Sequence, residues 1–157
     1  MTALVSYSID TSSIIHARRR AYPPDIFPSL WDRIEGLIQE HTLVATEEVL
    51  HELERQDDEI YRWASRQTEM FIPIDREIQP IVSGILLQHP NLIDVRRNRS
   101  GADPFVIALA IHRGSTVVTQ EVPTNHPSRP HIPDVCAAVS IPCINILQLI
   151  REQGWSI

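Results

Sequence analysis

The sequence predicts a three-layer α/β/α domain in which a central parallel sheet of four to five strands is flanked by helices. Short runs rich in β-branched and aliphatic residues alternate with helical patterns along the chain, which is typical of a parallel sheet covered on both faces. The 157 residues contain no repeat, low-complexity segment or linker, so we expect one domain over residues 1–157. A composition that is 43% hydrophobic and 22% charged is ordinary for a globular protein.

The strands and helices are predicted from periodicity and from capping residues. Five runs are expected to be strands: residues 4–9, 42–45, 70–74, 115–119 and 141–146. Helices are expected to begin at Ile14, Pro28, Thr46, Asp57, Asp75, Asp103, about Val135, and Leu147. Three segments are expected to be loops: residues 18–24, the basic stretch 91–101, and the proline-rich stretch 123–133.

The stretch around Asp103 has the strongest local signal. Asp103 stands where an N-cap is expected and Pro104 where the first helical residue is expected. The helix that follows is apolar on nearly all sides, so we expect it inside the domain. A carboxylate at the tip of a buried helix is either a structural cap or a site residue, and this stretch alone fits both.

Composition and charge limit which partners and which cellular compartment we expect for this protein. The net charge of −6 provides no general basic field for nucleic acid, so a polyanion would have to be held locally. Two cysteines are too few for a disulfide framework and are expected to be small buried side chains in a reducing compartment. The longest apolar run, 104–111, is far below the roughly 20 residues of a membrane span, and the N-terminus lacks a signal-peptide pattern. We therefore expect a cytoplasmic protein without a membrane partner.

Four acids fall near the ends of the predicted strands. Asp10 follows the first strand, Glu121 lies two residues beyond the fourth, Asp103 begins the helix before that strand, and Glu52 lies in the helix after the second. Parallel sheets place ligands beyond the carboxyl ends of their strands, so the fold could bring these acids together.

Clustered carboxylates require a counter-charge. Two of them about 5 Å apart repel by roughly 3 kcal/mol at an effective dielectric constant near 20. A hard divalent cation would relieve this repulsion, and oxygen ligands favour Mg²⁺ or Mn²⁺. Helix capping and surface exposure are the alternative explanations of these acids.

The chain resembles the PIN-domain ribonucleases, which include the toxin halves of VapBC-type toxin–antitoxin pairs. It is most similar to an uncharacterised PIN-like family of prokaryotic proteins. The resemblance covers almost the whole chain, and the Asp103 block is its most specific part. The stretches that carry it are residues 9–12, 45–53, 101–110, 117–121, 132–136 and 145–155.

The resemblance implies Mg²⁺- or Mn²⁺-dependent hydrolysis of RNA on a parallel sheet flanked by helices. The family acids fall on Asp10, Asp103 and Glu52, with Glu48 as the rival of Glu52 one turn earlier. The fourth acid departs from the family pattern, because many relatives have Asp directly after the threonine of the fourth strand. Glu121 occupies this region here, and Asp134 is the substitute candidate.

Other polar residues have supporting roles in this interpretation. The hydroxyls of Ser12 and Thr119 could orient an acid or a bound water, although turn and strand-end capping explain them equally well. Two arginine clusters lie in sequence beside site acids, where an RNA backbone would need counter-charge. They contain Arg18, Arg19, Arg20, Arg96, Arg97 and Arg99. A solvated face is the alternative.

The leading hypothesis is therefore an endoribonuclease that acts as the toxin of a type II pair, with an antitoxin protein as partner. The apolar C-terminal helix around Ile146–Ile150 fits either a homodimer interface or closure onto the chain's own sheet. The alternative function is a catalytically silent RNA- or protein-binding module. A phosphatase with Asp10 as nucleophile is disfavoured, because Ser12 stands where a second acid is usual and the sequence has no lysine.

Overall fold

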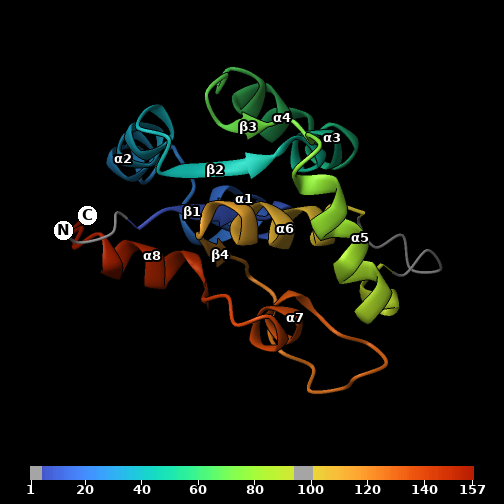
Figure 1. The fold of residues 1–157 in the computed structure, drawn as a ribbon. Helices are drawn as coiled ribbons and strands as arrows, with labels where there is room; N and C mark the ends of the chain where they lie inside the picture. Colours follow the sequence, from blue (N-terminus) through green and yellow to red (C-terminus); the bar gives the residue numbers. More distant parts are fainter. Residues whose placement is uncertain (1–4, 94–100) are drawn as a thin grey trace.

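The computed structural model describes residues 5–93 and 101–157, and its centre is a five-stranded parallel sheet (Figure 1). The strand order is β3-β2-β1-β4-β5, and neighbouring strands are parallel. The strands are β1 (Tyr7–Ile9), β2 (Leu43–Thr46), β3 (Phe71–Ile72), β4 (Thr116–Val118) and β5 (Cys143–Ile144). The predicted α/β class with a central parallel sheet is confirmed.

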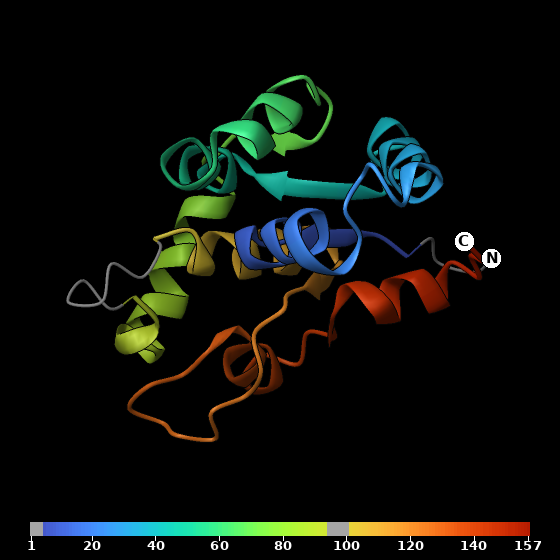
Figure 2. The ribbon, with the colours of Figure 1, turned by 180° about the vertical axis from the view of Figure 1, so that it is seen from behind.

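Helices cover both faces of this sheet. They are α1 (Thr11–His16), the π-helix η1 (Ala17–Ala21), α2 (Pro28–Gln39), α3 (Glu47–Gln56), α4 (Asp58–Ser65), α5 (Ile78–Gln88), the 3₁₀-helix η2 (Pro90–Leu92), α6 (Asp103–Arg113), α7 (Ile132–Ala138) and α8 (Ile146–Glu152). Helix α6 contacts β1, β2 and β4 on one face, and α1 lies on the opposite face, as the two views show (Figures 1 and 2).

The strand order determines where a ligand would bind. After β1 the chain proceeds outward to β2 and β3, then returns to the other side of β1 with β4 and β5. The carboxyl ends of β1 and β4 therefore meet at the point where the winding reverses, which is the usual ligand position in open parallel sheets. Asp10 donates its backbone N–H to Val118 O at 3.0 Å, so Asp10 and Thr119 leave adjacent strands at this point.

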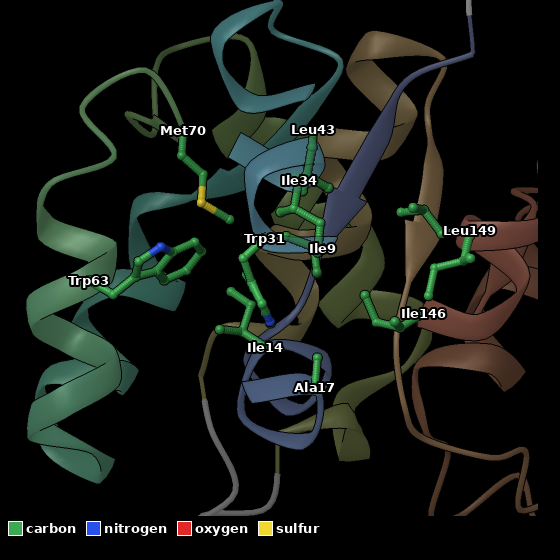
Figure 3. Close-up of a pocket in the computed structure, with 11 residues that line it drawn as sticks. Ile9, Ile14, Ala17, Trp31, Ile34, Leu43, Trp63, Met70, Ile146 and Leu149 are labelled. Atoms are coloured by element: carbon green, nitrogen blue, oxygen red, sulfur yellow. The ribbon is translucent and has the colours of Figure 1, made fainter. Parts of the chain in front are cut away.

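The hydrophobic core lies on both sides of β1 and β2. On one side a small apolar cavity of about 10 Å³ lies among side chains of β1, α1, η1, α2, α4 and α8 (Figure 3). A cavity of that size holds at most one water molecule, so it is a packing void rather than a ligand site. Ile146, Leu149 and Ile150 are buried here, whereas Leu147 is 44% exposed. The apolar face of α8 is thus covered largely by the chain's own core.

Several predicted boundaries were wrong for local reasons. Helix α1 begins at Thr11 rather than Ile14, because the Asp10 carboxylate accepts the backbone N–H of Ser13 and caps the helix earlier. Residues 18–20 continue it as a π-helical turn instead of a loop. Helix α5 begins at Ile78, since Asp75 caps the preceding turn by accepting the N–H groups of Glu77 and Ile78.

The position of Asp103 in its helix also differs by one residue from the prediction. Asp103 is the first residue of α6, and Ala102 is the N-cap, with no side-chain capping hydrogen bond. Its carboxylate is therefore in the first helical turn, where the helix dipole still favours negative charge. Most of the predicted 91–101 loop lies outside the described residues. In the described parts of the chain, no helix combines the length and apolar character needed to cross a membrane.

Candidate active site

All four acids that the sequence singles out line one pocket. It has a volume of about 210 Å³ and lies at the carboxyl ends of β1 and β4. Its lining residues are Asp10, Thr11, Ser12, Glu52, Gln56, Asp103 and Glu121. These residues come from four separate stretches of sequence, so it is the fold that assembles the acidic pocket.

Asp10 is a buried acid that several hydrogen bonds hold in place. It is 2% exposed, and its Oδ1 accepts the backbone N–H of Ser13 at 2.8 Å. Its Oδ2 accepts the hydroxyls of Ser12 at 2.8 Å and Thr119 at 2.5 Å. Burial raises the pKa of Asp10 above its usual value, and these hydrogen bonds, which favour the carboxylate, oppose the rise only in part.

The two hydroxyls also join Asp10 to the segment that carries Glu121. Thr119 Oγ1 accepts the backbone N–H of Glu121 at 3.1 Å, and Ser12 Oγ accepts that of Gln120 at 3.3 Å. Each hydroxyl thus donates to Asp10 and accepts from the chain beyond β4. The backbone of residues 120–121 is consequently positioned by the same atoms that orient the Asp10 carboxylate.

Glu52 reaches the pocket from α3. This helix begins at the predicted cap Thr46, whose hydroxyl oxygen accepts the N–H of Glu48 at 3.4 Å. Glu52 is 1% exposed, and its Oε1 accepts the Thr11 hydroxyl at 2.8 Å. The rival Glu48 does not line the pocket; its Oε1 is 3.6 Å from Nδ1 of His51. Of the two glutamates, Glu52 is the pocket acid.

Glu121 and Asp134 have separate surroundings. Glu121 lines the acidic pocket, and its Oε1 is 3.9 Å from Nδ1 of His131. Asp134 lines a different pocket and accepts the N–H groups of Thr124, Asn125 and His131 at 2.8–3.0 Å. Partial burial alone would raise the pKa of Asp134, but these hydrogen bonds lower it to about 2. Asp134 therefore organises the proline-rich loop, and Glu121 is the fourth acid of the pocket.

Two pocket residues are absent from the sequence prediction. Thr11 holds Glu52, and the only signal for it was its place in the capping turn after the first strand. Gln56, the last residue of α3, lines the pocket one helical turn beyond Glu52, and no sequence feature marked it. Both contribute neutral hydrogen-bonding groups to the edge of the acidic pocket.

The donor set has the chemistry of a site for a hard cation, since its acids offer only carboxylate oxygens. Within residues 5–93 and 101–157, however, no three His, Cys, Asp or Glu side chains are grouped so that they could hold a metal ion. The acids line a common pocket without converging on one point. A cation held by three of them would require rotation of the longer glutamate side chains.

In the first arginine cluster, Arg18 and Arg19 contact other side chains of the same chain. The Arg18 guanidinium lies 4.5 Å and 4.3 Å from the ring centroids of Trp31 and Trp63. Arg19 pairs with Asp57 at 2.6 Å and with Glu59 at 3.2 Å. Arg20 is exposed. Arg96, Arg97 and Arg99 lie outside the described residues, so RNA binding by either cluster stays a prediction.

Comparisons with known proteins identify a family and a fold. A family model described as "Domain of unknown function (DUF4411)" matches residues 7–157. No curated protein sequence matches the chain. The chain is similar in structure to VapBC2 from Rickettsia felis, solved bound to a DNA fragment from their promoter, with a TM-score of 0.56 and 16% identity over 90% of this chain and 98% of that one.

The chain is also similar in fold to a second solved structure. It is FitAcB from Neisseria gonorrhoeae, with a TM-score of 0.52 and 15% identity over 88% of this chain and 96% of that one. At these identities the likeness concerns the fold, which is PIN-like, as the sequence resemblance predicted.

Proposed function

The chain belongs to the DUF4411 family of domains of unknown function, and from its PIN-like fold and acidic pocket we propose that it is a metal-dependent endoribonuclease. The observation that carries the proposal is the meeting of Asp10, Glu52, Asp103 and Glu121 in one pocket at the winding reversal of the sheet. Capping alone would not require four acids from separate segments to line the same cavity.

In this proposal Asp10 and Asp103 would hold Mg²⁺ or Mn²⁺, and Glu52 and Glu121 would complete its set of protein ligands. Such a cation lowers the pKa of a bound water and offsets the negative charge on phosphate oxygens. Ser12 and Thr119 fix the Asp10 carboxylate, and Thr11 does the same for Glu52. Gln56 and the exposed Arg20 supply groups that could contact the RNA backbone.

We further propose that the chain is the toxin of a toxin–antitoxin pair. The resemblance to VapBC-type toxins and the fold likeness to VapBC2 support this finer proposal. The partner would then be an antitoxin protein. Cell growth after induction, with and without the neighbouring gene, tests the toxin role separately from the enzymatic one.

The direct test of nuclease activity uses the purified chain with mixed single-stranded and structured RNA and with Mg²⁺, Mn²⁺ or EDTA. We expect cleavage that depends on the metal and is lost in Asp10→Asn and Asp103→Asn. Glu48→Gln is the matched control, because it removes a charge from α3 outside the pocket.

Two observations favour the alternative of a catalytically silent binding module. The acids of the pocket are not grouped as metal ligands in the described residues, and the fourth acid is a shifted glutamate. RNA binding without cleavage under every metal would establish this alternative and overturn the nuclease proposal.

A further inference from the structure

A second pocket lies between the end of α5 and the proline-rich loop 123–133. Its volume is about 460 Å³, which is within the usual range of small-ligand sites. None of the residues that line it also lines the acidic pocket. They are Gln88, His89, Asn125, His126, Pro127, Pro130 and Asp134. The metal chemistry proposed above makes no use of this second pocket.

Hydrogen bonds hold the loop side of the second pocket in one shape. Besides the N–H groups that Asp134 accepts, the Thr124 hydroxyl oxygen accepts the backbone N–H of His126 at 3.1 Å. The Ser128 hydroxyl oxygen lies 2.7 Å from Nδ1 of His126 and so orients the imidazole ring. Asn91 in η2 donates from Nδ2 to Ser128 O at 3.0 Å. The pocket is therefore formed before a ligand enters, which lowers the entropic cost of binding.

The residues of the second pocket fit a nucleobase. Imidazole rings such as those of His89 and His126 are flat surfaces on which an unpaired base can stack. The carboxamides of Gln88 and Asn125 each offer a donor and an acceptor for the edge of a base.

A phosphate group fits the second pocket less well. The described residues that line it include no arginine, and the sequence has no lysine. Asp134 brings a negative charge, and its oxygens already accept backbone N–H groups. The pocket therefore favours a flat, uncharged ligand with a hydrogen-bonding edge over an anion.

The two pockets are joined by a short stretch of chain. Glu121 lines the acidic pocket, and Asn125, four residues later, lines the second one. Their Cα atoms are at most about 14 Å apart, since an extended chain spans 3.3–3.6 Å per residue. His131 Nδ1 donates to Val122 O at 2.9 Å and so fixes the start of the loop between the pockets. A strand held by one phosphate at the acidic pocket could place a nearby base in the second pocket.

We propose that the second pocket binds an unpaired base of the RNA strand whose backbone lies at the acidic pocket. His126 stacks on this base, and Asn125 hydrogen-bonds to its edge. The inference rests on the proposed function, because it takes RNA as the substrate. It adds a site at which the chain distinguishes a base-bearing single strand from a bare sugar–phosphate chain.

The experiment measures binding in EDTA, where metal-dependent cleavage is switched off. The full-length chain, labelled with ¹⁵N, is titrated with short single-stranded oligomers of adenosine, cytidine or uridine nucleotides. The control ligand is an abasic oligomer of the same length, which keeps the phosphates and lacks the bases. We expect at least one base-bearing oligomer to shift the NMR signals of the Asn125 carboxamide and the His126 ring. The abasic oligomer should leave both signals in place.

Variants of the loop test the two roles. His126→Ala should weaken the base-bearing oligomer at least about fivefold, the lower end of the effect of losing one stacking side chain. His126→Phe keeps a flat ring and should retain the binding. Asn125 has a φ of 56°, a left-handed conformation that glycine adopts without strain, so Asn125→Gly removes the carboxamide and should also weaken binding. His51→Ala is the control, since His51 is exposed on α3 and lines neither pocket.

Three results would overturn the proposal. They are equal shifts with the abasic oligomer, no shift at either residue with any oligomer, and wild-type affinity in both His126→Ala and Asn125→Gly. An equal loss in His126→Phe and His126→Ala would refute stacking as the role of His126. Failure of the base pocket would leave metal-dependent cleavage intact, whereas a chain that binds bases here without cleaving RNA would refute only the nuclease proposal. The two failures are therefore distinguishable.

Discussion

The Thr119 hydroxyl donates a 2.5 Å hydrogen bond to Oδ2 of Asp10, although the two residues are 109 positions apart in the sequence. The contact joins the ends of two adjacent parallel strands, β1 and β4, at the winding reversal of the sheet. Thr119 also accepts the backbone N–H of Glu121. One hydroxyl therefore connects the Asp10 carboxylate to the segment that carries Glu121.

Removing the Thr119 hydroxyl should lower the activity of the pocket without unfolding the chain. We predict that Thr119→Val lowers RNA cleavage or metal affinity by about 10- to 100-fold, the usual effect of losing a partner that orients a metal ligand. Thr119→Ser keeps the donor and should retain most of the activity. The measurement is cleavage rate as a function of Mn²⁺ concentration. Loss of activity in Thr119→Ser together with full activity in Thr119→Val would show that the methyl group, not the hydrogen bond, matters.

Glu52 and Glu48, which both lie in α3, should differ in their effect on metal-dependent cleavage. Glu52 is buried in the pocket, whereas Glu48 lies outside it beside His51. Glu52→Gln should therefore lose most of the metal-dependent cleavage, and Glu48→Gln should match the wild type. Both variants remove one negative charge from the same helix, so the pair controls for net charge. A greater loss in Glu48→Gln would reverse the assignment.

Asp134 should stabilise the fold in a pH-dependent way. Its folded pKa of about 2 is below the ordinary value of 3.8, so its contribution is fully present above about pH 4 and is lost as the pH falls towards 2. We predict that Asp134→Asn lowers the free energy of unfolding at pH 7 by about 1–2 kcal/mol, because hydrogen bonds to a charged acceptor are lost. Urea unfolding at pH 7 and pH 3 measures it.

The difference between Asp134→Asn and the wild type should shrink at pH 3. A difference that is constant with pH would contradict the linkage. Metal-dependent cleavage should persist in this variant, since Asp134 lies outside the acidic pocket.

Arg20 is the described member of its cluster best placed for an RNA contact, because Arg18 and Arg19 already have intramolecular partners. We predict that Arg20→Gln weakens RNA binding and reduces the dependence of log affinity on log salt concentration by about one. Arg151→Gln, in the last turn of α8, is the control of equal charge. An unchanged salt dependence would remove Arg20 from the RNA surface.

The fold class was predictable because one or more helices separate each strand from the next, an order typical of a parallel sheet with covered faces. The positions of Asp10 and Asp103 followed from their places beside a strand end and a buried helix. Which of Glu121 and Asp134 lines the pocket could not be predicted from the sequence, since it depends on how a proline-rich loop folds back on α7.

The role of Arg18 was equally invisible in the sequence. Its position over two adjoining indole rings depends on the packing of α2 against α4, and local sequence pattern does not indicate that contact. The π-helical turn that carries Arg18 likewise differs from the loop expected from its composition. Tertiary packing determines both features.

We propose that the pocket acids together bind a divalent cation. The most direct test is the binding of Mn²⁺, by electron paramagnetic resonance, to the wild type, Asp10→Asn, Asp103→Asn and Glu48→Gln. The Asp10→Asn substitution keeps a side-chain oxygen for the Ser13 amide, so α1 retains its cap. We predict one saturable site in the wild type and in Glu48→Gln, with affinity weakened at least about 10-fold in each pocket variant. Equal Mn²⁺ affinity in all four proteins would contradict it.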